Sequence, residues 1–145
     1  MASNALKSSI LEDLRQAPGH LLRRCQQIAV SVFLDECQTW DLTPVQFAVL
    51  VELNRHGPHD QVGLGGALAM DRTTIGVVVK KLEERGLVER SISEQDRRSK
   101  PVSITSAGSA LIRNVLPAAE MAQDRMLAPL NDAERSQFML SLIHI

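Results

Sequence analysis

The chain has 145 residues, 44% of them hydrophobic and 23% charged, with a formal net charge of −1. This length suffices for one domain with a buried core that needs neither disulfides nor metal, and the composition excludes a disordered chain. No apolar run approaches the about 18 residues that a membrane-spanning helix needs, and residues 1–9 lack the apolar core of a signal peptide. We therefore expect a cytoplasmic protein without a membrane partner.

Two helices are predicted before residue 38. The first is short, and its apolar stripe ends before Pro18; the stripe comprises Leu6, Ile10, Leu11 and Leu14. The second extends from about Gly19 to Cys37, and its apolar side comprises Leu22, Cys25, Ala29, Val32 and Phe33.

The third predicted helix has a clear start. Thr43 is a suitable cap, Pro44 suits the first helical position, and Gln46 completes a capping box. Phe47 and other apolar residues follow at helical spacing, and Gly57 with Pro58 ends the helix.

Two more helices should follow in close succession. A short one begins after Asp60, with Leu64, Ala67 and Leu68 facing the core, although Gly63, Gly65 and Gly66 are poor helix formers. Asp71 then caps a helix from about Arg72 to Arg85, and Gly86 supplies the left-handed stop.

A β-hairpin and two helices complete the chain. Residues 87–92 and 102–104 alternate as strands, with a polar tip at 93–100, and Pro101 makes the second strand an edge or its starting point. Thr105 caps a long helix to about Met126 that Pro117 kinks. Asn131 with Glu134 starts the last helix, on which Phe138 and Leu142 are expected in the core.

The helix at 72–85 has the shape of a DNA-recognition helix. Its buried face is formed by Ile75, Val78, Val79 and Leu82. The other side is small and uncharged near its start and basic further on, which suits a major groove about 12 Å wide. The predicted DNA contacts on this helix are Arg72, Thr73, Thr74, Gly76 and Lys80. The alternative is an ordinary solvated face, but a short helix before it and a hairpin after it favour DNA.

The hairpin tip is the second DNA candidate. Arg97, Arg98 and Lys100 place three positive charges in four residues, and an arginine at such a tip can enter a narrow minor groove. Asp96 would repel phosphate, so we expect it to organise the turn or hold a neighbouring arginine. An isolated hairpin of this kind would be interpreted as a solvated charged loop.

Several motifs together resemble the MarR family of winged-helix regulators. They are Leu42–Phe47, Asp71–Thr74, Leu82–Val88, Asp96–Arg98, Ile104–Thr105 and Gly108. The resemblance implies a mainly α fold with a small β-hairpin wing, a winged helix-turn-helix, in which Arg98 is the minor-groove arginine and Asp96 its organiser. It implies a single domain over 1–145, with a DNA-binding module at about 42–105. It also implies dimerisation helices at about 1–38 and 106–145.

The same resemblance implies a homodimer that binds a pseudo-palindromic operator in double-stranded DNA and acts there as a repressor. It also implies a small-molecule effector. On the second helix, four polar residues fall within about 60° of one another, and this stripe could bind a carboxylate or phosphate. The stripe consists of His20, Arg24, Gln27 and Ser31. Trp40 and Phe47 are candidate walls for an aromatic ring. Residues 20–24 and 26–28 are similar to regulators of aromatic-acid catabolism, so an aromatic acid or aryl-CoA thioester is the expected effector. The alternative is that the polar stripe is a plain solvent face and that the two aromatic residues belong to the core.

Other functional classes are less well supported. Cys25 and Cys37 lie about 18 Å apart if both are on one helix, too far to bridge, so they are expected to be reduced thiols, with a redox-responsive regulator as the alternative. A helix-turn-helix used for protein contacts would not need a basic tip. No nucleotide-binding loop, catalytic triad or zinc spacing is present, so we expect neither an enzyme nor a cofactor nor a metal.

Overall fold

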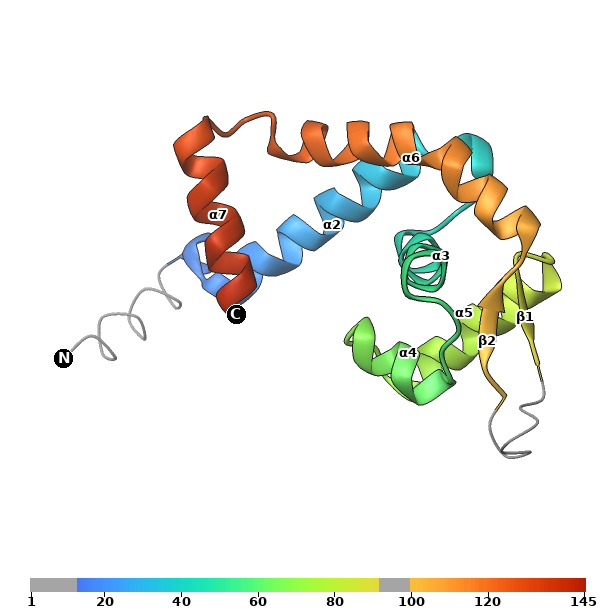
Figure 1. Cartoon of the computed structure of the whole chain (residues 1–145). Coiled ribbons are helices and arrows are strands. Elements are labelled where there is room, and N and C mark those ends of the chain that lie inside the picture. The colour runs from blue at the N-terminus through green and yellow to red at the C-terminus, as the bar shows by residue number, and fades with distance from the viewer. Residues whose placement is uncertain (1–12, 92–99) are drawn as a thin grey trace.

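The computed structural model describes residues 13–91 and 100–145, so the predicted stripe residues Leu6, Ile10 and Leu11 lie outside it. The chain order is shown in Figure 1. The elements are η1 (Leu14–Gln16), α2 (Pro18–Glu36), η2 (Gln38–Trp40), α3 (Pro44–His56), α4 (Gln61–Ala67), α5 (Arg72–Glu84), β1 (Val88–Arg90), β2 (Val102–Ile104), α6 (Ser106–Leu127) and α7 (Asp132–His144). The prediction of a mainly helical fold with one hairpin is confirmed.

The elements form two connected parts. Helices α2 and α6 pack side by side, and α3 lies between them and the group made by α4, α5 and the two strands (Figure 1). One continuous apolar core joins these parts. The largest side chains sealed in it are Leu50, Leu53, Leu64, Ile75 and Leu82.

The predicted helix starts are confirmed by their caps. Thr43 and Gln46 form the complete capping box of α3, and Asn131 and Glu134 form that of α7. Asp60 accepts the Gly63 N–H at 2.7 Å at the start of α4. Each cap satisfies backbone N–H groups that the first helical turn leaves without a partner, which fixes where each helix begins.

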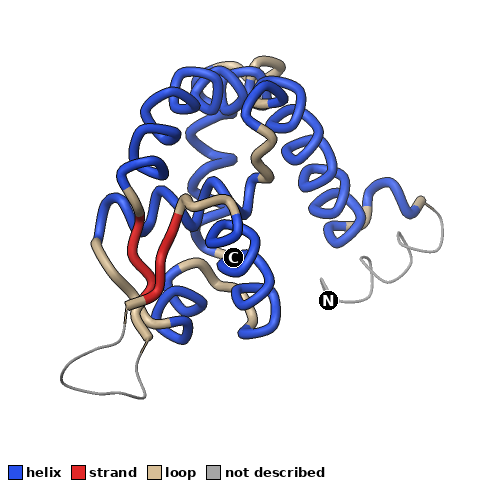
Figure 2. Tube along the Cα trace, turned by 90° about the vertical axis from the view of Figure 1, so that its right-hand side faces the viewer, coloured by secondary structure: helices blue, strands red, loops and turns tan. Residues whose placement is uncertain are grey.

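The hairpin is antiparallel and shorter than predicted. Val88 pairs with Ile104 and Arg90 with Val102, and the Ser91 N–H still donates to the Pro101 carbonyl at 3.1 Å. Strand β2 begins directly after Pro101, which was one of the two predicted roles of that proline. Figure 2 shows the two strands lying side by side. At the start of β2, Val102 also exchanges two backbone hydrogen bonds with His59, so this strand is held on both sides.

Two glycines are required by close packing. A Cβ on Gly108 would lie 2.2 Å from the Leu87 carbonyl oxygen, and one on Gly65 would lie 2.9 Å from that of Met70. Gly108 therefore lets α6 pass directly over the start of the hairpin, and Gly65 lets the turn into α5 close. Gly86 adopts the predicted left-handed conformation, with φ of +69°.

Three sequence expectations need correction. Ala67 is exposed, because the short helix α4 turns only Leu64 and Gly65 fully into the core. Phe138 is only half-buried and Leu142 is 39% exposed, because both face an apolar cavity between α2, α6 and α7 instead of the core. Helix α6 includes Pro117 and continues to Leu127, and the predicted kink at Pro117 stays a prediction.

Within the described residues, no single helix has both the length and the apolar content to cross a membrane. Helices α4 and α5 have that length and apolar content only when taken together, and they are bent by 108° relative to each other.

The two kinds of glycine should respond oppositely to alanine. Gly108→Ala forces a Cβ against a backbone carbonyl and should lower the free energy of unfolding by about 1–3 kcal/mol. Gly66→Ala is the matched control: no atom lies within 4 Å of its Cβ position, so it should raise the free energy of unfolding by about 0.5–1 kcal/mol. Urea unfolding followed by circular dichroism measures both. A stabilised Gly108→Ala variant would contradict the packing described here.

Candidate DNA-binding surface

Helix α5 is anchored by one face and presents the other. Ile75, Val79 and Leu82 have no exposed surface, and they pack into the core against α3 and β1. The predicted DNA contacts lie off this face: Arg72, Thr73, Thr74 and Lys80 are exposed, and Gly76 is half-buried. Val77, between them, is 51% exposed. The structure therefore brings the five predicted residues of this helix onto one accessible surface.

Asp71 fixes the start of that surface. Its carboxylate accepts the Thr74 N–H at 2.9 Å and the Thr74 hydroxyl at 2.6 Å. These hydrogen bonds from Thr74, and a weaker one from the Thr73 N–H, hold the pKa of Asp71 below its ordinary value. The N–H and the hydroxyl proton of Thr74 are thus both used within the helix start, where Asp71 is the N-cap.

A residue of α4 also reaches this surface. A Cβ on Gly76 would lie 3.2 Å from Nε2 of Gln61, so the Gln61 side chain lies across the space that Gly76 leaves open. Gln61 is the first residue of α4. Gln61 was not among the predicted DNA contacts, because only its position at a helix start, and no periodicity, marks it.

The basic residues near α5 have acidic neighbours. Lys80 Nζ lies 3.9 Å from Glu84, and the Lys80 side chain is still 74% exposed. Arg90 Nε on β1 lies 3.5 Å from Glu83. An exposed pair of this length contributes little, so the Lys80 ammonium stays available to a phosphate.

The predicted wing tip is only partly described. Asp96, Arg97 and Arg98 lie outside the described residues, and Lys100 is exposed and separated from β2 by Pro101. The base from which the tip projects lies next to α5, since β1 follows α5 after Gly86 (Figures 1 and 2).

The predicted effector residues lie on α2. Arg24, Gln27 and Ser31 are exposed and His20 is half-buried. The cation that links this stripe is Arg23, which the sequence analysis did not choose: its Nη1 donates to Gln27 at 2.9 Å, and its Nη2 lies 3.4 Å from His20 Nδ1. Helical spacing from residues 20 and 27 could have indicated it.

The two aromatic candidates contact the core. Trp40 and Phe47 are partly buried and pack against the core cluster, and the Phe47 ring lies 5.4 Å from that of Phe33. Each therefore has a packing role in this structure, beside which the predicted role as a ligand wall stays a prediction.

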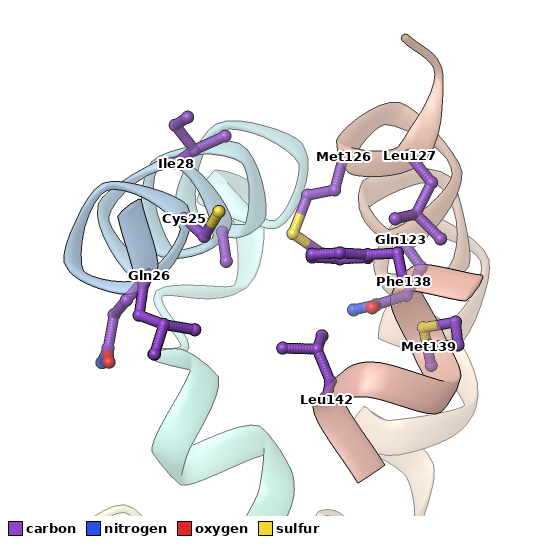
Figure 3. A pocket seen from close by; sticks show the side chains of 11 residues that line it. Cys25, Gln26, Ile28, Gln123, Met126, Leu127, Phe138, Met139 and Leu142 are labelled. Carbon is purple, nitrogen blue, oxygen red and sulfur yellow. The ribbon is translucent and has the colours of Figure 1, made fainter. Parts of the chain in front are cut away.

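An apolar cavity of about 460 Å³ lies between α2, α6 and α7. Phe138 and Leu142 of α7 point into it across from Cys25 of α2 (Figure 3). The residues around it are Leu22, Cys25, Gln26, Ile28, Ala29, Gln123, Met126, Leu127, Phe138, Met139 and Leu142. The predicted effector residues are not among them, because the polar stripe and this apolar side lie on opposite sides of α2.

The two cysteines have different surroundings. Cys25 is exposed, whereas Cys37 has no exposed surface, and burial, with a smaller effect of the Glu36 charge, raises the pKa of the Cys37 thiol. A raised pKa disfavours the reactive thiolate. Within residues 13–91 and 100–145, no three His, Cys, Asp or Glu side chains are placed to hold a metal ion.

Several known proteins are similar to this chain in sequence and in fold. The MarR family model matches residues 42–100. The transcriptional repressor NicR of Pseudomonas putida is 36% identical over 123 residues, which cover 85% of this chain and 78% of NicR. The chain belongs to the MarR family. It is thus a DNA-binding transcription regulator, and the resemblance seen in the sequence is confirmed.

Two solved MarR-family structures are similar over nearly the whole chain. BpsR of Bordetella bronchiseptica, described for regulation of its DNA binding by 6-hydroxynicotinic acid, is 33% identical with a TM-score of 0.86 and covers 91% of this chain and 94% of its own. PcaV of Streptomyces coelicolor, described in complex with its natural ligand, is 32% identical with a TM-score of 0.83. The match covers 91% of this chain and 92% of PcaV.

The Asp71 carboxylate should give a pH-dependent contribution to stability. Because its pKa is lower in the folded chain, its contribution is present above the unfolded value of about 3.8 and is lost as the pH falls through the folded value. Asp71→Asn keeps an oxygen acceptor for the Thr74 N–H but cannot titrate. The wild type should melt at a higher temperature than Asp71→Asn at pH 7, and the gap should shrink from about pH 4 downward. A constant gap would show that the carboxylate charge has no such role.

Proposed function

We propose that this MarR-family regulator is a homodimer that binds a pseudo-palindromic operator, represses transcription there, and is released by a small aromatic acid. The observation that carries the proposal is the free outer side of α5. Its inner side is sealed into the core at Ile75, Val79 and Leu82, while Thr73, Val77 and Lys80 are exposed. No other side of this helix is available to a duplex.

Each outward residue has a role that suits DNA. Thr73 is small, so the first turn can approach base edges closely, and the Val77 methyl groups suit the methyl group of thymine. Over Gly76 it is the Gln61 side chain that would meet the DNA. Arg72 and Lys80 lie toward the two ends, where they can contact phosphates. Arg97, Arg98 and Lys100 of the wing add charge, with Arg98 entering the minor groove and Asp96 ordering the tip.

The dimer is proposed from the terminal helices. The cavity between α2, α6 and α7 is apolar, and further apolar side chains of α6 and α7 stay exposed, among them Met121 at 60% and Ile143 at 72%. Covering such a surface with a second copy removes it from water. The chain would then be one domain, with the DNA-binding module at about 42–105 and dimerisation helices at about 1–38 and 106–145. Two α5 helices about 34 Å apart would enter successive major grooves.

An aromatic acid is the proposed effector class, and no cofactor or metal is included. BpsR, at 33% identity, is regulated by 6-hydroxynicotinic acid according to its description, and NicR is named a repressor. On this chain, the polar stripe of His20, Arg24, Gln27 and Ser31 offers a cation and hydrogen-bond donors to a carboxylate. An aryl-CoA thioester would present phosphates to the same charges.

The effector would act by shifting a population. The free dimer samples spacings of the two α5 helices, and the effector favours a spacing that does not fit the operator. Linkage requires that operator DNA weakens effector binding by the same factor. The proposal needs no catalytic step and places the protein in the cytoplasm, with its DNA.

Two alternative functions have less support. A redox-responsive regulator would need a reactive thiol, and the raised pKa of Cys37 works against one there. A helix-turn-helix used for protein contacts would not account for the basic tip of the wing.

DNA binding can be tested by gel shift over a range of salt concentrations. A duplex selected from a random pool by the wild type should lose affinity steeply with salt. Arg98→Ala should weaken binding at least about tenfold, since a desolvated groove contact is lost, and Lys80→Ala should lower the salt slope by about one. Unchanged melting temperatures are the control for folding. Unaltered affinity of Arg98→Ala would show that the wing does not contact DNA.

Effector binding can be tested by calorimetry. Titration of 6-hydroxynicotinic acid, benzoate-type acids and hydroxycinnamoyl thioesters should show at least one ligand that binds and also releases the operator. Arg24→Ala should weaken that ligand about tenfold, as expected for loss of a charge-assisted contact. Arg113→Ala, another exposed arginine but on α6, is the matched control. No binding across this panel would remove the aromatic-acid proposal and leave the DNA-binding proposal intact.

A further inference from the structure

We propose that Arg85 is a positioning residue that joins the recognition helix α5 to the η2 corner after α2 and so fixes the spacing of the two recognition helices in a dimer. The inference rests on the proposed function, because spacing matters only to a dimer on two half-sites.

Arg85 spans two distant parts of the chain with one planar group. It follows the last residue of α5, and its Nη1 donates to the Asp41 carbonyl at 2.7 Å while Nη2 donates to the Trp40 carbonyl at 3.0 Å. The acceptors are 44 and 45 residues earlier in the sequence. A guanidinium that holds two successive carbonyls fixes an orientation as well as a distance.

The arginine end of this link is rigid. Gly86 turns the chain out of α5 with φ of +69°, and its N–H donates to the Glu83 carbonyl at 2.9 Å. The Thr105 hydroxyl donates to the Gly86 carbonyl at 2.7 Å, which ties the same corner to the start of α6. The side chain of Arg85 therefore begins from a fixed backbone.

The acceptor end is rigid too. Asp41 adopts a left-handed conformation with φ of +49° at the end of η2. Cys37 before this corner is completely buried, and Leu42 after it is 2% exposed. The Trp40 N–H also donates to the Cys37 carbonyl at 3.1 Å, so the corner cannot shift without disturbing the core.

The acceptor corner belongs to the α2–α6 framework. Arg125 of α6 pairs with Asp35 and, at 2.9 Å, with Glu36, in the last turn of α2. Arg85 thus connects α5 to the η2 corner, which follows within five residues the end of α2 that α6 also holds. Because both ends of the connection are fixed, any tilt of α2 relative to α6 must carry the C-terminal end of α5 with it, or break two hydrogen bonds.

The consequence concerns operators with altered spacing. One extra base pair moves a half-site by about 3.4 Å and turns it by about 34°. A dimer with firmly held α5 helices should reject such a duplex. Without the Arg85 link, each winged module can rock and should tolerate it better.

The experiment compares three duplexes by gel shift: the selected operator, and versions with one base pair added or removed between the half-sites. We expect the wild type to bind the altered duplexes at least about tenfold more weakly, the size of a lost base contact. Arg85→Ala should reduce that penalty at least about threefold while its affinity for the selected operator changes by less than about threefold, because α5 keeps its base contacts. Arg113→Ala, which removes the same charge from α6, should retain the full penalty.

Two further variants test the link in other ways. One keeps the charge at position 85, and the other changes the acceptor end. Arg85→Lys keeps the charge but not the fork, and should give an intermediate penalty. Asp41→Val disfavours the left-handed corner and should lower the penalty as Arg85→Ala does. The double variant should lower the penalty no further than either single variant. These variants decide the question if Arg85→Ala does not fold.

The outcomes separate this inference from the proposed function. An equal loss of affinity on all three duplexes, with a salt slope lower by about one, would make Arg85 a phosphate contact and overturn the inference. An unchanged penalty in Arg85→Lys and Asp41→Val would also overturn it. A wild type that binds no two-half-site duplex would contradict the proposed function instead.

Discussion

The sealing of one side of α5 is the constraint on which the rest of this molecule depends. Ile75, Val79 and Leu82 have no exposed surface, so α5 cannot rotate about its axis without exposing them. The side that remains is the side that carries Thr73, Val77 and Lys80. An exposed surface that suits DNA thus results from ordinary core packing, and the hairpin and α4 lie beside it because they cover the same core.

Much of this fold was predictable because its signals are local. A capped helix start has a side-chain acceptor three residues before the N–H that donates to it, so Thr43 and Asp71 could be identified as caps from the sequence. The left-handed stop at Gly86 and the change from helical to alternating periodicity after it located the hairpin. The outward side of α5 followed from the spacing of its apolar residues, and for this reason the residues predicted to contact DNA lie off the buried side, while the contacts themselves stay a prediction.

The parts that were not predicted depend on contacts across the chain. The hydrogen bonds of Arg85 join positions 44 and 45 residues apart, and no periodicity encodes them. Phe138 and Leu142 have a core-like spacing, yet they face a groove, since spacing shows that a side is apolar but not what covers it. Arg23 and Arg24 both suit the stripe on α2, and only the side-chain geometry shows that Arg23 meets Gln27.

The contact between α6 and the hairpin at Gly108 bears on how relatives should be compared. Position 108 admits only a hydrogen atom as side chain, because the Leu87 carbonyl oxygen lies where a methyl group would be. A homologue that carries a larger residue at the equivalent position must have moved its last long helix away from the strands. In such a homologue the wing would leave the body of the protein in another direction, and its DNA contacts could not be transferred position by position from this chain.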